Sequence, residues 1–198
     1  MFTDSDFLVF TDPTLSGRME KIRATIDPKF EKMAVPMLRV LEAATGEAWF
    51  DHVAKHRMRT TNAPDTTWVA FSTNKRGYKM LPHFELGFWH DNLYLYLAVE
   101  SNMKPKQTDV IYPKLKALGK LVEQLPSYFV LSQNHMVNQT LPLSEYSQVV
   151  EQFKKVKALD VLIGIKIERG DKRFGTSALD DDLEQTLKTL LPLYEKLV

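Results

Sequence analysis

The stretch HFELGFWHDNLYLYLAVE, residues 83–100, decides the fold. Apolar side chains recur at every second position on both sides of Asp91-Asn92, which is the pattern of a strand with one buried face. Asp and Asn tolerate the positive φ angles of tight turns. The stretch therefore predicts a β-hairpin made of residues 83–89 and 93–100.

With Asp91-Asn92 as the two-residue loop, the hairpin has a defined register and two faces of different character. An apolar face, expected to pack on the core beneath the N-terminal helices, pairs Phe88 with Leu95, Leu86 with Leu97, and Phe84 with Val99. A mixed aromatic and polar face pairs Trp89 with Tyr94, Gly87 with Tyr96, Glu85 with Ala98, and His83 with Glu100.

The rest of the chain alternates between helical and extended patterns. Apolar residues at spacings of three and four predict helices over about 14–26 and 28–45, the second beginning at Asp27-Pro28 and ending at Gly46. Further helices are expected over 113–124, after Ser144 and from about Asp180, and strands over 66–72, 128–133 and 161–168. This order predicts one α+β domain over residues 1–198, with a mixed, largely antiparallel sheet and a central hairpin, covered by helices.

Composition excludes several classes of protein. The 198 residues contain 26 Lys and Arg against 25 Asp and Glu, a net charge of +1 that argues against a general nucleic-acid coat. The absence of Cys excludes disulfide scaffolds, Cys-ligated metals and thiol catalysis. The N-terminus has no basic segment followed by an apolar one, and no apolar run is long enough to cross a bilayer, so we expect a cytoplasmic protein without a membrane partner.

Positive charge concentrates in residues 52–84, which hold six basic residues and the single acid Asp65. Such a cluster favours phosphate or carboxylate, although charged runs are also ordinary solvated surface. Our leading hypothesis is a binding module for an anionic small molecule or nucleic acid. Charge would come from Arg57, Arg59, Lys75, Arg76 and Lys79, and stacking surface from Trp68, Tyr78, Trp89, Tyr94 and Tyr96.

One composite anion site imposes a condition on the fold. A seven-residue strand is roughly 20 Å long, so the basic groups before and after residues 66–72 cannot otherwise reach one small ligand. Residues 55–60 would have to run antiparallel beside this strand and bring Arg57 near Asn74.

Two other functions stay open. His83 and Glu85 lie two residues apart on a strand and would point the same way, as acid and base groups of a small enzyme; an ion pair of His83 with Glu100 is the structural alternative. A structural or protein-interaction role is the third reading. His52 and His56 have the spacing of helical metal ligands, but no third ligand is identifiable and neighbouring cations oppose a metal, so we predict no metal. Nucleotide-binding glycine motifs are absent, so we predict no cofactor.

The central run RTTNAPDTTWVAFS, residues 59–72, followed by NKRGYKMLPHF, residues 74–84, resembles the YktB-like family of Gram-positive bacteria. The opening MFTDSDFLVF and the segment Pro28-Lys29-Phe30 are similar too, so the resemblance spans most of the chain. It implies a compact single-domain α+β protein of the cytoplasm, and it supplies no catalytic residues.

Overall fold

The computed structural model describes residues 1–198, apart from the side chain of Lys106. The helices are α1 (Leu15–Lys21), α2 (Asp27–Thr45), α3 (Lys104–Ala117), α4 (Gly119–Val122), α5 (Tyr146–Lys155) and α6 (Ser177–Leu197), with short 3-10 or π-helical segments η1 (Asp4–Thr11), η2 (Ile22–Ile26), η3 (Ser101–Met103) and η4 (Leu143–Glu145). The strands are β1 (Phe50–Val53), β2 (Thr66–Ser72), β3 (His83–Trp89), β4 (Asn92–Val99), β5 (Val130–Ser132), β6 (Leu141–Pro142) and β7 (Val161–Glu168).

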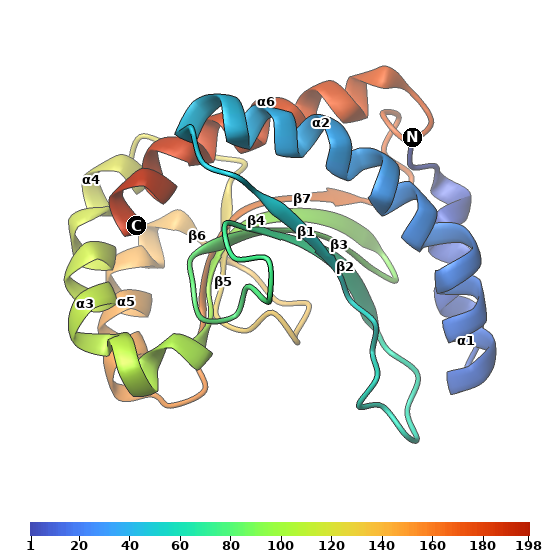
Figure 1. The fold of residues 1–198 in the computed structure, drawn as a ribbon, viewed down its shortest axis with the longest axis horizontal. Coiled ribbons are helices and arrows are strands. Elements are labelled where there is room, and N and C mark those ends of the chain that lie inside the picture. Colours follow the sequence, from blue (N-terminus) through green and yellow to red (C-terminus); the bar gives the residue numbers. More distant parts are fainter.

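All strands join one sheet in the order β1-β2-β3-β4-β7-β5-β6. The sheet is strongly curved, with α2 and α6 along its convex side, and α3 and α5 beside one end (Figure 1). This confirms an α+β fold with a central hairpin and covering helices. Every pairing among the described residues is antiparallel, so the parallel contribution implied by a mixed sheet does not occur.

The core lies between the convex side of the sheet and the helices. Phe84, Leu86 and Phe88 are fully buried there, on the apolar face that the alternation predicts. The ring of Phe88 meets the rings of Phe2 and Phe7 edge to face, each with centroids 5.1 Å apart, so the N-terminal segment packs directly on the hairpin.

The hairpin register differs from the predicted one by two residues. The loop is His90-Asp91 instead of Asp91-Asn92, because β3 ends at Trp89 and β4 already begins at Asn92. Phe84 consequently lies opposite Leu97, and His83 opposite Ala98. A two-residue shift preserves the alternation of faces, so the predicted core face is correct while each predicted pair is wrong.

The N-terminal helices also differ from the prediction at their junction. No break separates the two helices: Asp27 is the first residue of α2 and has helical φ and ψ, so it is not an N-cap, and its backbone N–H bonds to the carbonyl of Ile22 in η2, five residues earlier. This wider turn accommodates Pro28, which lacks an N–H and would collide with a tightly wound preceding turn. Gly46 ends α2 with a φ of 69°, as expected for a glycine cap.

Other boundaries follow the strength of the local pattern. The strands predicted over 66–72, 83–89 and 161–168 coincide with β2, β3 and β7. The short edge strands β1 and β6 are not predicted, and α3 begins nine residues before the expected Pro113. Within the described part of the chain, no helix combines the length and apolarity needed to span a membrane.

Candidate functional site

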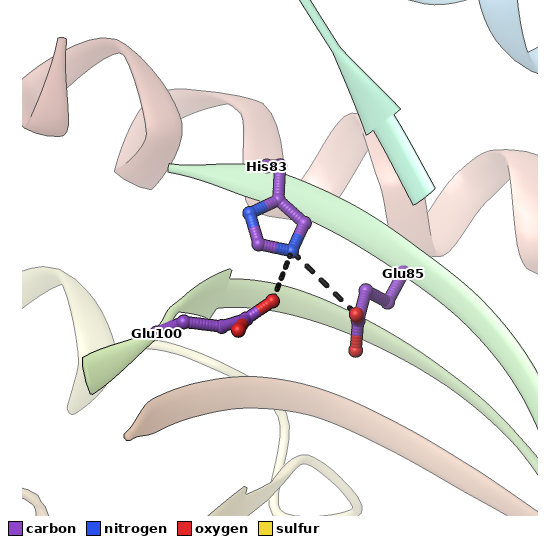
Figure 2. Close-up of side chains that lie close together, drawn as sticks. All are labelled: His83, Glu85 and Glu100. Carbon is purple, nitrogen blue, oxygen red and sulfur yellow. Dashed lines mark ion pairs between the residues drawn. The ribbon is translucent and has the colours of Figure 1, made fainter. Parts of the chain in front are cut away.

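The concave face of the sheet carries a second, smaller apolar cluster that surrounds polar groups. Its buried members are Trp68, Ala70, Trp89, Tyr94, Tyr96, Ala98 and Leu162. Strand alternation places His83 and Glu85 on this face of β3, and Glu100 two positions beyond Ala98 on the same side of β4. Figure 2 shows the three side chains converging, with the imidazole of His83 directed toward both carboxylates.

The three side chains form a close and fully buried cluster. His83 Nε2 lies 3.6 Å from Glu85 Oε1 and 3.6 Å from Glu100 Oε1, and none of the three side chains reaches solvent. The contact predicted between His83 and Glu100 is therefore present, but as a diagonal one, since Ala98 is the direct partner of His83. Its complete burial is not what an ordinary surface ion pair would show.

Most polar atoms of the cluster have no hydrogen-bond partner. Both carboxylate oxygens of Glu85, Oε1 of Glu100 and Nε2 of His83 are buried and unpartnered, whereas Oε2 of Glu100 accepts a 2.8 Å bond from the Asn102 amide. Burial and the neighbouring charge of Glu85 raise the pKa of Glu100 above its ordinary value. Two carboxyl groups thus share a desolvated space, which costs free energy unless something compensates their charge.

A second titratable pair faces the cluster from another part of the chain. His135, in the loop after β5, holds Asp160 through a 2.7 Å contact between Nδ1 and Oδ2. Burial lowers the pKa of His135, but the bond to Asp160 and the charges of Glu85 and Glu100 outweigh burial and raise it to about 8. The backbone N–H of Ser101 also donates to Asp160, at 2.7 Å, which fixes the carboxylate that orients His135.

The loop between β2 and β3 covers the cluster and borders a cavity. The ring of Tyr78 packs edge to face on His83 with centroids 4.8 Å apart, and its hydroxyl accepts a 2.9 Å bond from the indole N–H of Trp68. Lys79 Nζ lies 3.9 Å from Glu100 Oε2. Tyr78 and Lys79 also line a cavity of about 470 Å³, together with His52, Asn74, Arg76, Gly77 and Met80.

The basic groups of the predicted composite anion site do not share one site. Residues 50–53, and not 55–60, pair with β2, so the chain leaves the sheet opposite Val69 and the loop of residues 54–65 extends past the Thr66 end of the strand. Arg57 and Arg59 line a separate cavity against α1, whereas Arg76 and Lys79 follow the Ser72 end of β2. The condition for a single site is not met.

The remaining predicted residues have simple locations. Trp89, Tyr94 and Tyr96 are buried in the concave cluster, where the two tyrosine rings stack 4.9 Å apart. Lys75 is exposed in the turn after β2. Of the predicted ligand residues, the structure thus brings Trp68, Tyr78, Lys79, His83 and Glu85 together with Glu100.

Sequence reasoning missed His135 and Asp160 as site residues. Their positions after β5 and before β7 show no local motif, and only the pairing of β5 with β7 brings them to the concave face. Glu100 was identified only as an ion-pair partner, although its even spacing from Tyr96 and Ala98 already placed it on the polar face.

Fold and site together define an α+β protein whose antiparallel sheet carries a buried cluster of one histidine and two glutamates on its concave face. The chain belongs to the family described as "Domain of unknown function (DUF1054)", which matches residues 2–194. The expected membership in the YktB-like group of Gram-positive bacteria is thereby confirmed.

Relatives in several genera match over nearly their whole length. A "UPF0637 protein" of Leuconostoc mesenteroides subsp. mesenteroides is 56% identical over 197 residues, which cover 100% of both chains. A "UPF0637 protein" of Leuconostoc citreum is 48% identical over 98% of both chains, and one of Lactiplantibacillus plantarum is 38% identical over 98% of this chain and 94% of its own.

Proposed function

We propose that the protein is a small enzyme that acts on an anionic small molecule at the concave face of the sheet. The observation that carries this proposal is the pair of unpartnered, fully buried oxygens of Glu85 beside His83 and Glu100. Buried polar groups are normally satisfied, and buried groups with a shifted pKa, such as Glu100 here, are concentrated at functional sites. A fold under no functional demand would gain stability by replacing Glu85 with an apolar residue.

His135 and Asp160 supply the acid–base part of the proposal. The contact to Asp160 holds the proton on Nδ1 of the neutral ring, so a proton is accepted or released at Nε2. A carboxylate that orients a histidine in this way is the usual arrangement of a general base. Glu85, which with His83 is the pair predicted from sequence, contributes negative charge that favours the protonated form of His135.

The cavity beside Tyr78 supports an anionic substrate of modest size. Its volume of about 470 Å³ lies in the range of small-molecule sites, and Arg76 and Lys79 provide its positive charge. Two cations at one cavity favour a small anion over a nucleic-acid strand, which needs a longer basic track. Binding without reaction is the second candidate function, and Arg76 and Lys79 favour it equally.

Hydrolysis of p-nitrophenyl phosphate, bis(p-nitrophenyl) phosphate and p-nitrophenyl acetate tests the enzyme proposal. We expect turnover of at least one substrate, reduced at least ~100-fold in His135→Gln, which loses the acid–base group, and in Glu85→Gln, which loses the buried charge beside it. His90→Gln and Glu184→Gln, which remove exposed groups of the same type, should keep wild-type rates. Absence of turnover, or turnover unaffected by the first two variants, contradicts the proposal.

Two charge-reversal variants test the anion site itself. Arg76→Glu with Lys79→Glu should abolish the binding of inorganic phosphate measured by calorimetry. Arg57→Glu with Arg59→Glu makes the same change of charge at the other basic loop and should leave binding intact. Equal loss in both double variants would indicate a general charge effect and would exclude a site beside Tyr78.

A further inference from the structure

We infer that His83, Glu85 and Glu100 bind one divalent transition-metal cation. The inference rests on the same cluster as the proposed function and adds its metal, but it is tested by binding and not by turnover. One ligand atom from each side chain lies within 4.8 Å of those of the other two. His83 and Glu85 belong to β3, and Glu100 directly follows β4, so the paired strands position the three side chains.

The hydrogen bond on the far side of His83 fixes which ring nitrogen faces the carboxylates. Nδ1 lies 2.8 Å from the backbone carbonyl of Leu81. A carbonyl can only accept, so Nδ1 carries the proton and Nε2 of the neutral ring presents its lone pair to the glutamates. Metal-binding histidines commonly have this arrangement, with one nitrogen on the metal and the other donating to a backbone carbonyl.

The spacing of the ligand atoms suits an ion between them better than a proton. At 3.6 Å, each contact of Nε2 with a carboxylate oxygen is too long for a hydrogen bond. Two ligand atoms at about 2.1 Å from one tetrahedral ion are separated by roughly 3.4 Å. The two separations from Nε2 of His83 are therefore within a few tenths of an ångström of those around a common ion, and the ligand oxygens of Glu85 and Glu100 lie within 4.8 Å of each other.

Charge balance gives a second, independent reason. Two ionised carboxylates carry two negative charges, while a protonated His83 would supply only one positive charge. Lys79 is half-exposed and reaches only Oε2 of Glu100, at 3.9 Å. The charge of His135 is matched by its own partner Asp160, which it contacts at 2.7 Å. Both oxygens of Glu85 then stay without a hydrogen-bond partner in a fully buried space, and one divalent cation would neutralise the pair of carboxylates.

The ligand set indicates the class of ion. An imidazole nitrogen with two carboxylate oxygens suits Zn²⁺ or Mn²⁺, whereas Mg²⁺ and Ca²⁺ prefer oxygen ligands alone. Three protein ligands leave further coordination positions for water or substrate, as in catalytic zinc sites and unlike closed structural ones. Asn102 on Glu100 and Leu81 on His83 provide the outer hydrogen bonds that hold such ligands in place.

Calorimetric titration of tag-free protein, stripped with EDTA, tests the inference with ZnCl₂, MnCl₂ and MgCl₂ as probes. We expect one equivalent of Zn²⁺ to bind most tightly, Mn²⁺ less tightly and Mg²⁺ least, following the usual order of divalent metals. Glu85→Gln and Glu100→Gln should each weaken Zn²⁺ binding at least ~100-fold. His90→Ala, which removes an exposed histidine 3.6 Å from an aspartate, should bind Zn²⁺ as the wild type does.

The free energy of unfolding, measured in EDTA, tests whether the glutamate variants are folded before metal is added. Because each Glu→Gln change removes a buried charge, both variants should be at least as stable as the wild type without metal. No binding of any of the three cations by the wild type, or unchanged Zn²⁺ affinity in both glutamate variants, overturns the inference. Turnover that persists in EDTA would show that the enzyme does not need this metal. Metal binding without any turnover would support the metal site and contradict the proposed enzyme activity.

Discussion

The pair of His135 and Asp160 predicts a pH dependence of stability that one substitution removes. The pKa of His135 is about 8 in the folded protein against an ordinary value of 6.5, so the folded state binds this proton more tightly than the unfolded chain. The stabilisation is fully present below about pH 6.5 and is lost as the pH rises through 8. Each unit of difference in pKa between the folded and unfolded states is worth about 1.4 kcal/mol, so the rise from 6.5 to about 8 stabilises the folded protein by about 2 kcal/mol.

Urea unfolding in EDTA at pH 6 and pH 9 measures this contribution. Between the two pH values, the free energy of unfolding of the wild type should fall by about 2 kcal/mol more than that of His135→Gln. His90→Gln, at an exposed position in the hairpin loop, should follow the wild type. If His135→Gln keeps the full pH dependence, then Asp160, Glu85 and Glu100 do not stabilise the charged ring, and the reasoning about this pair is refuted.

Three further predictions concern packing and buried charge, each measured by reversible urea unfolding. Leu97→Ala should cost roughly 2–5 kcal/mol because this side chain is buried in the core, and a loss well under about 1 kcal/mol would contradict the assignment of faces. Gly164→Ala should abolish folding or cost more than about 3 kcal/mol, since the added Cβ would lie 1.9 Å from the carbonyl oxygen of Leu95. Gly119→Ala is the control: Gly119 has open space around it, so this change should be neutral or stabilising. Glu85→Gln should raise the metal-free stability by about 1 kcal/mol or more, and a clear loss would mean that the carboxylate is compensated.

The parts of the fold that could be predicted from sequence are those in which one physical pattern dominates. Strands β3 and β7 carry large apolar residues at every second position, and β2 is a short run of Thr, aromatic and small apolar residues, so the bounds of all three can be read from composition and spacing. The hairpin register was wrong by two residues because His90-Asp91 and Asp91-Asn92 are both acceptable loops, and local turn chemistry does not separate them. Strand β1 has no such pattern, since its residues are only partly buried at the edge of the sheet.

The candidate site could be predicted only in part, for a similar reason. Because side chains alternate between the two faces of a sheet, the sequence already places His83, Glu85 and Glu100 on one face. A register shift of two residues leaves each side chain on the same face. Tyr78, from the loop between β2 and β3, packs on His83, and the strand pattern does not describe this loop. The anion hypothesis joined Arg57 to Arg76 by assuming the wrong partner for β2, an error of long-range pairing.

The central claim is that the buried cluster on the concave face holds a divalent cation. Anomalous diffraction from crystals soaked in ZnCl₂, recorded above and below the zinc absorption edge, tests this claim most directly. We predict one strong peak about 2.0–2.2 Å from Nε2 of His83 and from an oxygen of each of Glu85 and Glu100. The same soak of Glu85→Gln crystals should give no peak at that position. Zinc bound only at surface histidines, with the cluster unchanged and dry between its three side chains, would contradict the account.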